Sequence, residues 1–103
     1  MKNRIYDVGD RIVLYADFRV RNTDGTYSLA DPTTVTVMLR KPDGTENSYT
    51  SGVDNPSVGV YTFETPTFLD GEEGTWYYRF KSTGIVGAEE GWFTVRASRF
   101  TTP

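Results

Sequence analysis

The sequence predicts an all-β domain, a two-sheet sandwich of six to seven short antiparallel strands. Ten glycines and five prolines are spread along the whole chain, so no helix of ordinary length has room to form. The segments between them are rich in Thr, Val, Tyr and Phe, which favour strands. Apolar residues recur at every second position, the period of a strand with one buried face. A small barrel is the alternative, because periodicity does not separate the two architectures.

An alternating segment over residues 11–21 predicts the first strand, because all of its core side chains fall on one face. These side chains are Ile12, Leu14, Ala16, Phe18 and Val20. The pair Asp24-Gly25 then predicts a tight turn. Residues 27–31 are expected to be irregular, because Pro32 removes a backbone donor just ahead of the next strand.

A hairpin is predicted from residues 33–40 and 45–51. The turn between them is Lys41-Pro42-Asp43-Gly44, in which proline presets φ and glycine accepts the positive φ that closes the hairpin. The returning segment is polar apart from Tyr49, which is typical of an edge strand. Residues 52–57 are expected to form a loop.

Three more strands are predicted over residues 58–65, 75–81 and 86–96. Their inward faces carry Tyr61 and Phe63, then Trp76, Tyr78 and Phe80, and finally Phe93 and Val95. Turns are predicted at residues 70–74 and 82–84, which are rich in Gly, Asp, Glu, Ser and Thr. With 103 residues, the chain is expected to form a single domain over residues 1–103, with residues 97–103 as a tail.

The composition argues against an enzyme. The chain has no Cys and no His, which excludes Cys-His and Ser-His-Asp catalysis. Lys81 and Ser82 are adjacent, so on a strand they point to opposite faces and exchange no proton. The carboxylate doublets Glu72-Glu73 and Glu89-Glu90 are interpreted as solvated charges, since a small sandwich rarely builds the cleft that glycoside hydrolysis needs.

The sequence predicts no cofactor, metal, nucleic-acid or membrane partner. The oxygen-rich turns at residues 7–10 and 70–74 lack the EF-hand spacing of calcium ligands. The net charge of −3 argues against an electrostatic footprint for nucleic acid. No run of about 18 apolar residues exists for a membrane span, and the N-terminal residues lack the apolar stretch of a secretory signal.

Aromatic side chains on outward strand faces are the most informative functional feature. Tyr15, Tyr77 and Trp92 lie opposite the core phase of their strands, and Arg79 shares the outward face of Tyr77. Phe100 lies in the tail beside Arg99 and is expected to dock into a neighbour or to fray. The candidate interaction surface comprises Tyr15, Tyr77, Arg79, Trp92 and Phe100. Aromatic residues mixed with arginine favour a protein interface; stacking on sugar rings, or cover by the second sheet or the tail, are the alternatives.

Several motifs occur together in a characteristic order. Tyr6-Asp7-Val8-Gly9-Asp10 opens the chain, and Arg40-Lys41-Pro42-Asp43-Gly44-Thr45 follows the second predicted strand. Gly74-Thr75-Trp76-Tyr77-Tyr78-Arg79-Phe80 and Gly91-Trp92-Phe93-Thr94-Val95 come later. From about residue 6 to residue 100, this order resembles the small immunoglobulin-like structural proteins of tailed bacteriophages. The Cys-Trp-Cys pattern of antibody domains is absent, which argues against that branch of the fold.

The resemblance implies an immunoglobulin-like sandwich that is a non-enzymatic structural component of a phage virion. It implies a head decoration, neck or tail protein, made in the host cytoplasm and assembled into the particle. Its expected partners are other virion proteins, with a homo-oligomer in a symmetric array as a further expectation. The alternative hypothesis is a carbohydrate-binding adhesion module for host-surface recognition.

Overall fold

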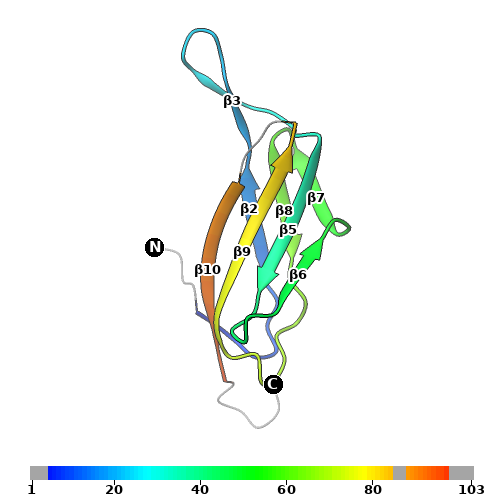
Figure 1. Ribbon diagram of the computed structural model, residues 1–103, viewed down its shortest axis with the longest axis vertical. Helices are drawn as coiled ribbons and strands as arrows, with labels where there is room; N and C mark the ends of the chain where they lie inside the picture. The colour runs from blue at the N-terminus through cyan, green and yellow to red at the C-terminus, as the bar shows by residue number, and fades with distance from the viewer. Residues whose placement is uncertain (1–4, 85–87, 98–103) are drawn as a thin grey trace.

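Two β-sheets pack face to face in the computed structural model, which describes residues 5–84 and 88–97 (Figure 1). The larger sheet has the strand order β1-β10-β9-β5-β6, the smaller has the order β2-β8-β7, and β3 and β4 form a separate hairpin. The strands are β1 (Ile5–Asp7), β2 (Val13–Asp17), β3 (Arg19–Arg21), β4 (Tyr27–Leu29), β5 (Thr34–Arg40), β6 (Glu46–Tyr49), β7 (Val53–Ser57), β8 (Val60–Glu64), β9 (Gly74–Thr83) and β10 (Ala88–Arg96).

The predicted all-β sandwich is confirmed. Its two sheets contain seven strands paired only antiparallel to one another, namely β2, β5, β6, β7, β8, β9 and β10. The strand β1 is an addition that the sequence did not predict, and it pairs with β10 in parallel, with Ile5 opposite Thr94 and Asp7 opposite Arg96. This short strand occupies an edge of β10 that would otherwise expose unpaired backbone groups.

The predicted core face over residues 11–21 is only partly confirmed: Leu14, Ala16 and Phe18 are buried and Ile12 packs against them. Val20 lies in the separate β3-β4 hairpin and outside the core, because the segment is not one continuous strand. The strand β2 leaves its partner β8 after Asp17, and the backbone N–H of Phe18 donates to the carbonyl of Gly59 at 2.7 Å. Beyond this break the chain continues as β3. The expectation that residues 27–31 are irregular is wrong, because Tyr27–Leu29 forms β4 opposite β3. Pro32 lies beyond the paired residues, so its missing donor does not interrupt this hairpin.

Residues 52–57 do not form the expected loop, since Val53–Ser57 is the edge strand β7. Its pairing with β8 shifts between Asp54 and Ser57, and this irregularity accommodates Pro56. The turn predicted at residues 82–84 is also shorter than expected. Ser82 and Thr83 still belong to β9 and pair with β5.

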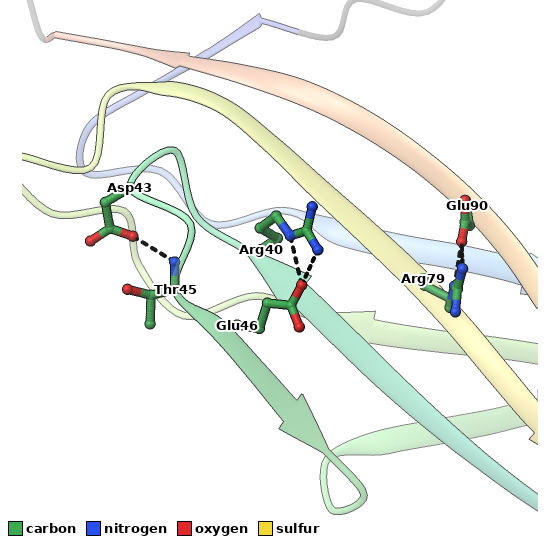
Figure 2. A network of polar contacts seen from close by, with 6 residues as sticks. All are labelled: Arg40, Asp43, Thr45, Glu46, Arg79 and Glu90. Atoms are coloured by element: carbon green, nitrogen blue, oxygen red, sulfur yellow. Dashed lines mark hydrogen bonds and ion pairs between the residues drawn. The ribbon is translucent and has the colours of Figure 1, made fainter.

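The hairpin between β5 and β6 has its predicted turn. Gly44 has a φ of 91°, and its N–H donates to the carbonyl of Lys41 at 2.9 Å. A carboxylate oxygen of Asp43 accepts the backbone N–H of Thr45 at 2.9 Å (Figure 2). The returning strand β6 lies at the edge of its sheet, as predicted.

The core lies between the two sheets and is rich in aromatic side chains. The inward faces contribute as the alternation predicted, since Val37, Phe80 and Val95 are almost fully buried. At one end of the core the rings of Trp76 and Phe93 stack with centroids 5.8 Å apart. The other buried apolar residues are Val8, Leu14, Ala16, Phe18, Leu39, Phe63 and Phe68.

The molecule is elongated, with extents of 56 × 28 × 21 Å. The hairpin of β3 and β4, residues 19–29, projects beyond one end of the sandwich and is called the arm below (Figure 1). The turns at residues 41–45 and 65–73 lie at the opposite end, where β5 ends and β9 begins (Figure 1).

Candidate interaction surface

An exposed aromatic pair lies on the outward face of the larger sheet. Trp92 of β10 is the direct cross-strand partner of Tyr77 of β9. About half of each residue remains exposed, 48% for Trp92 and 52% for Tyr77. The smaller sheet covers the opposite face of β9, where Trp76 and Phe80 are buried, so it does not cover this pair. Directly opposed residues on one face lie close enough to act as one surface.

Two ion pairs lie on the same outward face, and Figure 2 shows both of them. Arg79 contacts Glu90, its cross-strand partner on β10. Arg40, which lies opposite Tyr77 on β5, donates from Nε to a carboxylate oxygen of Glu46 at 2.6 Å. Since the four charged side chains are all substantially exposed, each pair contributes little to folding stability. Their effect is to hold two planar guanidinium groups beside the aromatic rings.

A groove with a volume of about 640 Å³ runs over this part of the sheet. Its walls include the side chains of Trp92, Tyr77 and the two arginines, together with Met38. Met38 lies opposite Arg79 on β5. The groove therefore combines apolar, aromatic and guanidinium groups, which is the composition typical of protein-interface anchors.

The inward face of β9 and β10, directly beneath this surface, is closely packed. Gly91 lies opposite Tyr78, and a Cβ atom added at Gly91 would lie within 2.4 Å of the tyrosine hydroxyl oxygen. The Tyr78 ring therefore fills the space that a side chain at residue 91 would need. It also packs edge-on against Phe80, with centroids 6.2 Å apart, which joins the back of the surface to the core.

The structure brings together only three of the five predicted site residues, Tyr77, Arg79 and Trp92. Tyr15 lies on β2, on the outward face of the smaller sheet. A hydrogen bond to the carboxylate of Asp17 raises the pKa of Tyr15 above its ordinary value. Phe100 lies outside the described residues. Tyr15 is therefore separate from the other three residues, and the sequence could not show this because it did not assign strands to sheets.

Arg40 and Glu46 belong to this surface but were not predicted. Both lie on strands that the sequence identified, and their alternation already places them on outward faces. Only the register of β5 against β9 places Arg40 beside Tyr77. That pairing joins residues far apart in the sequence, and no local pattern specifies it.

The described residues show no group of three or more acidic side chains placed to hold a metal ion. None of the described segments is a helix long and apolar enough to cross a bilayer.

The strand order defines an immunoglobulin-like domain. In that fold one sheet contains strands B, E and D and the other contains C, F and G, and variable-type domains add C′ beside C. The sheets β2-β8-β7 and β10-β9-β5-β6 reproduce B-E-D and G-F-C-C′ in chain order. The fold class predicted from the sequence is thus confirmed at this level too.

One solved structure resembles this chain in its fold. It is the crystal structure of the ZIG-8–RIG-5 IG1–IG1 heterodimer in a monoclinic form, with 10% sequence identity and a TM-score of 0.43. The similarity covers 92% of this chain and 83% of that chain. No protein-family model and no curated protein sequence matches this chain.

Proposed function

We propose that this chain is a non-enzymatic binding domain that contacts another protein through the outward face of its larger sheet. The observation that carries the proposal is the pair Trp92 and Tyr77, directly opposed and half exposed beside two arginines. Large aromatic and guanidinium side chains dominate binding energy at protein interfaces. A monomer gains nothing from leaving them in water, whereas a partner that covers them removes apolar surface from solvent.

The partner in this proposal is another subunit of a tailed-phage particle, at the head, neck or tail. The motifs at residues 6–10, 40–45 and 74–80 support it, because they resemble those of immunoglobulin-like phage structural proteins. The chain would then act in the virion. A small exposed patch supplies modest affinity, and repetition in a symmetric particle multiplies weak contacts into stable attachment.

The test combines electron microscopy of the intact particle with matched variants. Trp92→Ala should lower the number of copies bound per particle, because it removes a central aromatic anchor. Tyr15→Ala is the matched control, because Tyr15 is 49% exposed but lies on the smaller sheet. Both purified variants should melt close to the parent temperature. Normal occupancy with Trp92→Ala, or a particle map that lacks this domain, would contradict the proposal.

A carbohydrate-binding module is the second candidate, favoured by one observation. Tyr77 and Trp92 are adjacent and exposed for stacking on a sugar ring, and the carboxylates of Glu90 and Glu46 line the same groove as acceptors for sugar hydroxyls. Both carboxylates are engaged by arginines, which leaves them less free to accept sugar hydroxyls. Strong and specific signals on a glycan array, lost in Trp92→Ala, would favour this candidate over the protein interface.

A further inference from the structure

The arm, residues 19–29, is a second exposed element, remote from the aromatic pair. It belongs to neither sheet of the sandwich and projects from one end of the long axis (Figure 1). Two-stranded hairpins are marginally stable on their own, so an arm that merely linked β2 to β5 would need little internal structure. The hydrogen bonds at its tip and its root indicate that it is instead held in one conformation.

At the tip, side chains reinforce the turn. The amide of Asn22 donates to the hydroxyls of Thr26 and Ser28 at 2.9 and 2.8 Å. A carboxylate oxygen of Asp24 accepts the hydroxyl and the backbone N–H of Thr26 at 2.6 and 3.0 Å. These bonds hold the pKa of Asp24 below its ordinary value. The polar groups of the tip are thus engaged within the arm.

At the root, the arm is fixed to the turn between β7 and β8. The N–H of Phe18 donates to the carbonyl of Gly59 at 2.7 Å, and the N–H of Ala30 donates to the carbonyl of Phe18 at 3.0 Å. Asp31 accepts the N–H of Gly59 at 2.7 Å. Hydrogen bonds that join the backbone of Phe18 and the carboxylate of Asp31 to Gly59 therefore set the direction of the arm.

One face of the arm exposes arginine and large apolar side chains to solvent. Arg21 lies opposite Tyr27, and Arg19 lies opposite Leu29. Tyr27 is 62% exposed, the largest value among the exposed large apolar residues of the described chain. Arg19 pairs with Asp17, whereas Arg21 has no ion-pair partner among the described residues. Lys81 near the end of β9 is the other described cation without one.

The opposite end of the molecule carries the complementary groups. In the turn that leads into β9, Leu69 is 61% exposed, and Asp70 and Glu73 are exposed without a polar partner among the described side chains. The backbone of the turn is held in place, since Glu72 accepts the N–H of Leu69 at 2.9 Å and its side chain pairs with Lys41 at 2.8 Å. An exposed apolar side chain followed in the same turn by two acids without ion-pair partners matches an arm that offers a tyrosine and an arginine without one.

We propose that the arm of one copy binds the residue 69–73 turn of a second copy. Tyr27 packs against Leu69, and Arg21 faces Asp70 and Glu73. Because the two surfaces differ and lie at opposite ends of the long axis, the contact is head-to-tail and repeats from copy to copy, giving a ring or a filament. The contact is small and hence weak, which suits an element that acts in an array. It does not involve the aromatic pair of the larger sheet.

The test is sedimentation velocity of the full chain at low salt, up to about 1 mM, a range in which small interfaces still associate. The parent chain should form concentration-dependent oligomers that added salt dissociates. Tyr27→Asp and Leu69→Asp should each weaken association about tenfold or more, because each replaces an apolar contact side chain with a charged one that must be desolvated. In Tyr27→Asp the new acid also faces Asp70 and Glu73. Both residues are exposed, and thermal melts should show that both variants fold.

Mixing the two variants provides the sharpest observation. A head-to-tail contact predicts that an equimolar mixture of Tyr27→Asp and Leu69→Asp forms dimers and no larger species. The intact arm of a Leu69→Asp copy binds the intact turn of a Tyr27→Asp copy, and the altered arm and altered turn that remain cannot extend the chain of contacts. Tyr77→Asp should associate like the parent, which separates this contact from the sheet surface of the proposed function. A monomeric parent at every concentration, a mixture without dimers, or association lost in Tyr77→Asp but kept in Tyr27→Asp would overturn the inference.

Discussion

Replacing Gly59 by alanine tests how the arm is joined to the sandwich. Gly59 has a φ of +73°, which side-chain-bearing residues rarely adopt. A Cβ atom there would lie 2.8 Å from the backbone nitrogen of Ala30, 2.8 Å from the carbonyl oxygen of Phe18 and 2.9 Å from the Cβ of Leu29. Two of these three atoms belong to the backbone, so the clash cannot be relieved by turning a side chain.

The expected loss has two parts. Alanine in the left-handed region costs about 1–2 kcal/mol, and overpacking typically adds about 1–3 kcal/mol. Gly59→Ala should therefore lower the free energy of unfolding by about 2–5 kcal/mol. Gly44→Ala is the matched control, because Gly44 has a similar φ of +91° and no atom within 4 Å of its added Cβ. It should lose only the first part, about 1–2 kcal/mol.

Urea unfolding of the parent and both variants measures the two losses, with the slope of the transition checked for constancy. For a domain of this size, each kcal/mol shifts the melting temperature by about 4–8 °C. Equal losses in Gly59→Ala and Gly44→Ala would refute the reasoning, because they would show that the backbone at the arm root yields without cost.

Three further predictions follow from packing and charge. Trp76→Ala should cost about 3–5 kcal/mol in urea unfolding because Trp76 is buried, whereas Trp92→Ala should cost less than about 1 kcal/mol; equal costs would place both in the core. Glu72→Gln should destabilise the domain by about 1 kcal/mol at neutral pH, because it breaks the partly buried pair with Lys41; an unchanged melt would contradict this. Burial by itself raises the pKa of Glu72, but hydrogen bonds from Lys41 and Leu69 hold this pKa below its ordinary value. The ion pair therefore stabilises the fold fully above the pKa of Glu72 in the unfolded chain, about 4.3, and this stabilisation is lost as pH falls through the pKa of Glu72 in the folded chain. The difference in melting temperature between the parent and Glu72→Gln should therefore disappear in acid. It should persist up to alkaline pH, because the pKa of Lys41 is raised and its side chain stays charged there. A difference that grows in acid would contradict this prediction.

The faces of the strands could be predicted from the sequence, but their partners could not. Alternation placed Phe80 and Val95 inside and Tyr77 and Trp92 outside, because side-chain direction depends only on position along one strand. The assignment of a strand to a sheet depends on contacts between distant segments. Tyr15 was therefore grouped with Tyr77 although the two lie on different sheets.

Residues that favour turns predicted a turn correctly where four consecutive residues specify it. They were misleading where glycine and proline flank or interrupt a strand. The segment Lys41-Pro42-Asp43-Gly44 specifies its own geometry through proline, a carboxylate and a glycine, and the structure has that turn. In Val53–Ser57, the flanking Gly52 and the internal Pro56 also resemble a loop, but the edge of a sheet tolerates a missing donor. The arm was missed for a related reason, since three paired residues per strand give too short a pattern to recognise.

The parallel pairing of β1 with β10 determines how tension on the chain would act. Ile5–Asp7 lies beside Thr94–Arg96 with both strands running the same way. A force that pulls the two ends of the chain apart drives these strands past each other along their length. Their hydrogen bonds are then loaded together rather than opened one after another, so the domain should resist stretching far better than a terminal hairpin that can be peeled apart.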